Sequence, residues 1–115
     1  MEIQGLAFVG TRTGARAAMS SFVRDVLGLR PVGVEGAEGD FFAMPDGTSL
    51  AVTPPDDDGS TERTVGFLVA DVAAAVRELR AAGVDTDEPA ETSTQRYVHF
   101  RAPDGQLYEL VENLA

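Results

Sequence analysis

The sequence contains no cysteine and no lysine, and it has a single histidine. Without cysteine the chain has no disulfide framework, no thiolate metal ligands and no cysteine nucleophile. Its beginning, MEIQGLAFVG, has neither the basic start nor the long apolar run of a signal peptide. No apolar stretch approaches the roughly 20 residues that a membrane helix needs. These absences predict a cytoplasmic protein with no membrane partner.

Positive charge is also scarce. Nineteen acidic residues stand against nine basic ones, giving a formal net charge of -10, and every basic residue is an arginine. The arginines do not cluster, and so acidic a chain would repel a phosphate backbone, which argues against nucleic acid as a partner. The charge balance favours neutral or cationic small molecules instead.

What the chain does have is an internal repeat. With 115 residues, 43% of them hydrophobic, it can form one domain with a buried core. GLAFVG, a helical stretch and FFAMPDGTSLAVT in the first half match TVGFLVAD, a helical stretch and YVHFRAPDGQLYELV in the second. The pattern predicts a duplicated unit, with one module at 1–53, a solvated linker at 54–63 and a second module at 64–115.

Each half has the order strand, helix, then several strands. Apolar residues at helical spacing predict helices within 14–28 and at about 72–82. Cap and stop residues are expected at both ends: Thr13 and Gly28 for the first helix, Asp71 and Gly83 for the second. The two Pro-Asp-Gly turns, at 45–47 and 103–105, each lie between two strand-like runs and predict that these two runs form a hairpin.

Period-two alternation predicts which face each first strand turns to its helix. Leu6 and Phe8 form the bulky face of the first strand, and Val65, Phe67 and Val69 form that of its counterpart in the second half. We expect a helix on each bulky face. The opposite, small-residue faces would then line a concavity built from both halves.

Four segments resemble the vicinal oxygen chelate superfamily, the glyoxalase/bleomycin-resistance/dioxygenase fold: RDVLGL (24–29), FFAMPDGTSL (41–50), VGFLVADVAAAVRELRAAGV (65–84) and RAPDGQLYELVE (101–112). The resemblance covers nearly the whole chain. It implies an α+β fold in which two βαβββ modules form curved mixed sheets around a cavity. It also implies a homodimer, because related chains complete their cavities across a twofold interface; pairing of the modules within one chain is the alternative.

Metal-dependent members of that superfamily use four cavity-facing positions, an early residue of the first strand and a carboxylate of the last strand in each module. Transferred to this sequence, these positions are Gly5, Ala51, Thr64 and Glu109. Only Glu109 is a strong ligand, and a shift of one residue would add no more than Gln4. A divalent ion typically takes three or more protein ligands. We therefore expect no metal and no cofactor.

Glu109 stands mid-strand among apolar residues, where a carboxylate is costly to bury unless it binds something. Counting in steps of two places Tyr97, His99 and Arg101 on one face, and a tight turn would make His99 a cross-strand neighbour of Glu109. The pair could transfer protons as general acid and base. In the simpler interpretation, His99 and Arg101 only satisfy Glu109 at the edge of a pocket. Phe41 matches His99 in the first half and would supply apolar wall.

The sequence favours a protein that binds a small organic molecule in a cavity between modules without a metal, by analogy with drug-sequestering members of the superfamily. The alternative is a lyase or isomerase of the glyoxalase or epimerase type, with Glu109 and His99 as catalytic residues. A structural or regulatory protein with a vestigial cavity is a third reading. The polar loop 85–96 is expected to act as a lid or only as a connection. The ligand-binding candidates are Phe41, Tyr97, His99, Arg101 and Glu109.

Overall fold

The computed structural model describes residues 1–115, and its contacts divide the chain into two compact units. We call Phe8–Arg63 the N-terminal module, and Thr64–Ala115 together with Met1–Ala7 the C-terminal module. The linker residues 54–63 thus group with the N-terminal module. The first seven residues group with the C-terminal one.

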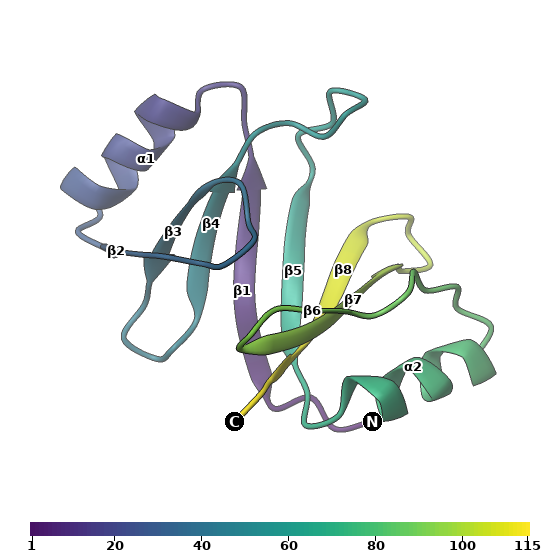
Figure 1. Ribbon diagram of the computed structural model, residues 1–115. Helices are drawn as coiled ribbons and strands as arrows, with labels where there is room; N and C mark the ends of the chain where they lie inside the picture. The colour runs from purple at the N-terminus through teal and green to yellow at the C-terminus, as the bar shows by residue number, and fades with distance from the viewer. The chain divides into compact units, whose positions relative to one another are not determined.

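The N-terminal module carries one helix and a mixed sheet (Figure 1). Its strands lie in the order β2-β3-β4-β1; β1 and β4 are parallel, and the other neighbours are antiparallel. The first residues of β1 belong to the other module by contacts. The elements are β1 (Gly5–Arg12), α1 (Arg16–Asp25), β2 (Arg30–Val32), β3 (Asp40–Ala43) and β4 (Ser49–Thr53).

The C-terminal module repeats this arrangement. Its strands lie in the order β5-β8-β7-β6, with β5 and β8 parallel and the remaining pairs antiparallel. The predicted α+β fold of two βαβββ modules with mixed sheets is confirmed. The elements are β5 (Arg63–Leu68), α2 (Val72–Ala81), β6 (Ala90–Glu91), β7 (Gln95–Arg101) and β8 (Leu107–Asn113).

Each helix covers one face of its own sheet. In the N-terminal module α1 packs on β3 and β4, and in the C-terminal module α2 packs on β7 and β8 (Figure 1). Burial of the apolar side chains between each helix and its sheet is the main favourable contribution that holds the two together. The buried cluster between α1 and its sheet consists of Val23, Phe42 and Val52, and the one between α2 and its sheet consists of Val69, Val72, Ala75, Val76, Val98 and Leu110.

The helix ends differ between the modules. Asp71 is the N-cap of α2, as predicted, and its Oδ1 accepts a hydrogen bond from the amide of Ala74 at 3.1 Å. The prediction for α1 is wrong: Ala15 is the N-cap position, and Thr13 lies two residues earlier, where its hydroxyl accepts from the amide of Ala15. The α1 cap therefore has no side-chain acceptor for the first turn. Gly28 and Gly83 follow the two helices with positive φ, as expected.

The predicted strand faces hold in one module and fail in the other. Phe67 packs on the α2 core, as predicted. Phe8, however, lies on the face away from α1, because its neighbour Val9 is the residue in register with Leu50, which packs on the α1 core. Leu6, expected under a helix, is 45% exposed. The run from Leu6 to Val9 is apolar on both faces, so alternation alone could not decide which face meets the helix.

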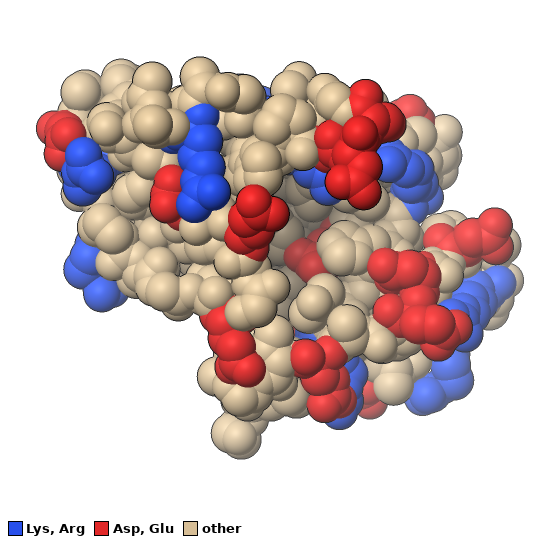
Figure 2. Space-filling model, turned by 45° about the horizontal axis from the view of Figure 1, so that its top comes forward, with Lys and Arg blue, Asp and Glu red and all other residues tan.

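The molecular surface reflects the charge balance. On the face drawn in Figure 2, acidic side chains are scattered, and the basic ones do not gather into a stripe. No helix is both long and apolar enough to cross a membrane.

Candidate functional site

Glu109 lies in the middle of β8, and only 8% of the residue is exposed. It is in register with Gly66 of β5 on one side and with His99 of β7 on the other. Its neighbour Leu110 belongs to the core under α2. Because successive side chains of a strand alternate, Glu109 points to the sheet face that α2 leaves uncovered.

His99 stands between two carboxylates. Its Nε2 lies 3.1 Å from Oε1 of Glu109, and its Nδ1 lies 3.0 Å from Oδ2 of Asp87. The predicted cross-strand contact of His99 with Glu109 is confirmed. An imidazole can donate from both nitrogens only when it is protonated. The hydrogen bond to Glu109 is the main cause that raises the pKa of His99 above 6.5, and Asp87 adds to it, while burial opposes the shift.

Asp87 was missed by sequence reasoning, which treated 85–96 as one polar loop. The segment runs along the free edge of β7: the amide of Asp87 donates to the carbonyl of His99 at 3.1 Å. The amide of His99 donates in return to Oδ1 of Asp87 at 2.8 Å. Further along, Ala90–Glu91 forms β6 on the same edge. The only sequence signal is an aspartate in a polar stretch, which does not predict a contact with a strand twelve residues away.

The other candidates lie around this pair in different ways. Tyr97 meets the His99 ring edge-on, with centroids 5.8 Å apart. Arg101 is in register with Leu107, and its Nη1 donates to the carbonyl of Gly105 in the hairpin. Phe41 belongs to the N-terminal module, where it pairs with Ala51 in the register that His99 has with Glu109. The match between Phe41 and His99 is therefore confirmed as a position in the fold.

A pocket of about 700 Å³ lies beside this group in the C-terminal module. One wall is the segment that follows α2, and the other is the end of β7 with its hairpin. Charged groups thus converge beside apolar ones, as in small-molecule sites generally. Among the lining residues are Val84, Asp87, His99, Arg101, Pro103 and Leu107.

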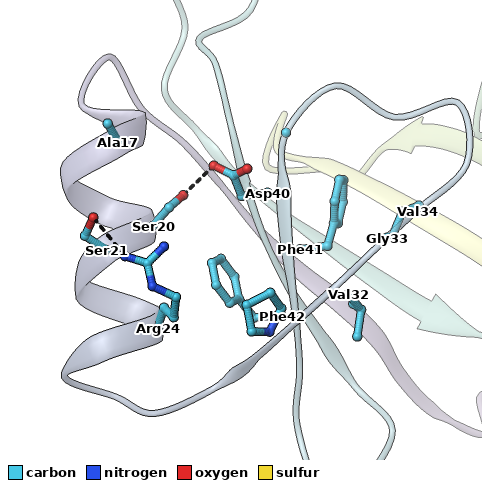
Figure 3. Close-up of a pocket in the computed structure, with 12 residues that line it drawn as sticks. Ala17, Ser20, Ser21, Arg24, Val32, Gly33, Val34, Asp40, Phe41 and Phe42 are labelled. Carbon is cyan, nitrogen blue, oxygen red and sulfur yellow. Dashed lines mark hydrogen bonds between the residues drawn. The ribbon is translucent and has the colours of Figure 1, made fainter.

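The N-terminal module has a pocket of its own, about 540 Å³, between α1 and β3 (Figure 3). In that view Phe42 points toward α1 and Phe41 points away from it. Asp40 faces the helix, where Ser20 donates to it at 2.6 Å and Arg16 at 3.1 Å. These hydrogen bonds, that of Arg16 first, hold the pKa of Asp40 below its ordinary 3.8.

The superfamily's metal positions do not fit a metal in this chain. Both Thr64 and Phe8 stand eight residues before the first residue of a helix, so Phe8, not Gly5, is the structural counterpart of Thr64. Phenylalanine and Ala51 offer no donor atom, and a neutral threonine hydroxyl is a weak one, so Glu109 alone remains. No group of three His, Cys, Asp or Glu side chains is placed to hold an ion. Around His99 the two carboxylates meet opposite ring nitrogens and do not converge on one point.

A family model described as glyoxalase/bleomycin resistance protein/dioxygenase superfamily matches residues 5–110. The chain belongs to this superfamily. Among curated proteins, none matches the chain.

Solved structures with a similar fold include two epimerases. Methylmalonyl-CoA epimerase from Mycobacterium tuberculosis is 22% identical with a TM-score of 0.79, over 98% of this chain and 90% of that one. A Streptomyces coelicolor methylmalonyl-CoA epimerase variant, in complex with 2-nitronate-propionyl-CoA, is 23% identical with a TM-score of 0.74, over 99% and 100%. A superfamily member from Vibrio splendidus 12B01 is 17% identical with a TM-score of 0.69, over 93% and 97%. At these identities the likeness establishes the fold alone.

Proposed function

We propose that this protein binds a small organic molecule without a metal, at the group formed by Asp87, His99 and Glu109. The observation that supports this most strongly is the buried carboxylate of Glu109 on a sheet face that no helix of its module covers. A carboxylate is kept in such a place at a cost unless it is paired. The imidazole of His99 pairs with it, and the pocket of about 700 Å³ opens beside that imidazole.

The charges indicate what the site would prefer. Asp85 and Asp87 line the pocket together with His99 and Arg101, and Glu109 lies against His99, so three carboxylates outnumber the basic groups even when His99 is protonated, in a molecule whose formal charge is already -10. The excess of carboxylates favours a neutral or cationic head group over an anionic one. Val84, Pro103 and Leu107 in the pocket wall supply apolar surface for the body of a ligand.

The test is a thermal-shift screen of cationic, neutral and anionic compounds of similar size, against the wild type and two variants. A ligand at about 100-fold excess over Kd stabilises the folded state by roughly 2.7 kcal/mol, which is readily seen. We expect a stabilising compound whose effect is lost in His99→Gln and kept in the linker variant Asp57→Asn. Equal shifts in both variants, or no stabilising compound at all, would refute the proposal.

The second candidate is an isomerase of the epimerase type. It is favoured by the contact of a buried carboxylate with an imidazole, and by the fold shared with methylmalonyl-CoA epimerases. Glu109 would accept a proton from a carbon next to a carbonyl group, and a solvent proton returned to the opposite face of that carbon would complete the inversion. His99 would hold the carboxylate in place. No metal role is assigned to this chain, since its residues do not supply the ligands.

Deuterium exchange separates the two candidates. An epimerase would incorporate solvent deuterium at the α-carbon of methylmalonyl-CoA in D₂O, and Glu109→Gln would abolish the incorporation. A binding protein would bind its ligand and return it unlabelled. Exchange that survives in Glu109→Gln would remove Glu109 from the reaction.

A further inference from the structure

The pocket of the N-terminal module carries one basic and one acidic side chain on opposite walls. Arg24 lies on α1 and Asp40 on β3, and both line the pocket of about 540 Å³ (Figure 3). The proposed site at His99 lies in the other module and uses neither residue. The apolar side chains of the lining are those of Ala17, Pro31, Val32, Val34, Phe41 and Phe42.

Arg24 retains donors that no residue of the chain uses. Its Nε donates to Asp25 at 2.8 Å, and its Nη2 donates to Asp25 at 3.0 Å and to Ser21 at 3.5 Å. A guanidinium carries about five N–H donors, so the pair on Nη1 remains. Asp25 does not line the pocket and is 61% exposed, and so open an ion pair contributes little. The Nη1 group of Arg24 can therefore donate to a second carboxylate, one that belongs to a molecule in the pocket.

The carboxylate of Asp40 can accept one further hydrogen bond. It already accepts two from Arg16, at 3.1 and 3.3 Å, and one from Ser20, at 2.6 Å. A carboxylate has about four acceptor positions, which leaves one. The Asp40 side chain is 40% exposed, and its hydrogen bond with Ser20, which is only 7% exposed, holds it at the pocket wall.

We propose that this pocket is a second ligand site, which binds an amino-acid-like zwitterion with an apolar side chain. The carboxylate of the ligand pairs with Nη1 of Arg24 beside the Ser21 hydroxyl, and its ammonium group donates to Asp40. The apolar side chain packs on Phe42 and Pro31. A ligand with only one charge would leave one of the two walls unmatched, so the zwitterion is selected over its two halves.

The test is an NMR titration of the full chain with three probes: L-phenylalanine, phenylacetate and phenethylamine. We expect L-phenylalanine to bind tightest and to shift amide signals of Ser21, Arg24 and Asp40. Losing one charge-assisted contact weakens binding about tenfold. Equal affinities for the three probes, or shifts confined to the other module, would overturn the proposal.

Two neighbouring substitutions sharpen the test, because they act in opposite directions. Arg24→Gln weakens binding of L-phenylalanine about tenfold by removing the partner of its carboxylate. Asp25→Asn strengthens it about threefold by removing the competing exposed carboxylate. Arg77→Gln, on the exposed face of α2, is the control and leaves this binding unchanged. Arg24→Gln with wild-type affinity would rule out the site.

Discussion

At the scale of single residues, the molecule is organised around one buried negative charge. Glu109 is tolerated in β8 because His99 faces it across the strand pair, and Asp87 holds the far side of the same ring. A buried carboxylate without a partner would bear its desolvation penalty uncompensated. Asp87 and Glu109 together favour the protonated imidazole, so three side chains act as one electrostatic unit.

Substitution of either member of the pair should reveal their coupling. His99→Gln takes the charged partner from Glu109 and should lower the free energy of unfolding by about 1–3 kcal/mol. The double variant with Glu109→Gln should lose less than the sum of the two single losses, by about 1 kcal/mol. Urea unfolding of the four proteins measures this. Strictly additive losses would mean that the contact contributes nothing.

The pH dependence follows from the raised pKa of His99. A group whose pKa is higher in the folded state stabilises the protein below its unfolded value, near 6.5 here, and loses that effect as the pH rises through the folded value. The stability advantage of the wild type over His99→Gln should therefore be largest in mildly acidic solution and shrink as the pH rises. Thermal unfolding of both proteins across this range checks the sign. An advantage that grows with pH would contradict it.

The sequence allows part of this group to be predicted. The hairpin closed at Pro103-Asp104-Gly105 fixes the register of its strands, so His99 opposite Glu109 follows from counting residues. Asp87 could not be found in this way. Its contact depends on how the segment after α2 returns along the edge of β7, and no local pattern encodes that path.

At the scale of elements, the two helices begin differently although the modules are duplicates. The first turn of α2 is held twice: Asp71 accepts from the amide of Ala74, and Glu112 of β8 accepts from the amide of Val72 at 2.9 Å. Both carboxylates also sit at the positive end of the helix dipole. The first turn of α1 has no such side-chain acceptor.

Cap substitutions should show this asymmetry. Asp71→Ala should cost about 1 kcal/mol of stability, because it removes the acceptor of an otherwise unsatisfied amide. Thr13→Ala should cost less, since its hydroxyl accepts only from Ala15, ahead of the helix. Chemical denaturation of the two variants compares them directly. A larger loss for Thr13→Ala would show that α1 depends on it as a cap.

The elements also show where periodicity fails as a predictor. The helices and hairpins are correct because their signals are redundant: apolar spacing, stop glycines and turn residues agree. The face of β1 is wrong because Leu6–Val9 gives no polar residue to mark the solvent side. There the register is fixed by β4 through Val9 and Leu50, which are 41 residues apart in the sequence.

At the scale of the whole molecule, the main electrostatic property is the excess of negative charge. Nine arginines cannot neutralise nineteen carboxylates, and several of the arginines are already engaged in ion pairs. Self-repulsion of such a charge opposes the compact state, and salt screens it.

The fold was predictable because the modules repeat and their motifs are those of a known superfamily. The ligand could not be predicted, because this chain lacks the side chains of the family's metal sites and its own pocket residues follow no known motif. The homodimer stays a prediction.

Salt should therefore stabilise the protein. Raising sodium chloride from low to moderate concentration at neutral pH should increase Tm, as screening relieves repulsion among the carboxylates. A salt titration followed by circular dichroism measures the change. A fall in Tm would indicate that the ion pairs outweigh the repulsion.

The proposed site has too few ligands for a metal ion, and a titration of chelator-treated protein with divalent ions checks this. Zinc, nickel and manganese, added in stoichiometric amounts at moderate ionic strength, should leave Tm of the wild type and of Glu109→Gln unchanged, because Glu109 lacks companion ligands. Saturable, one-to-one stabilisation of the wild type by any of these ions, absent in Glu109→Gln, would show that Glu109 belongs to a metal site and would refute the metal-free proposal.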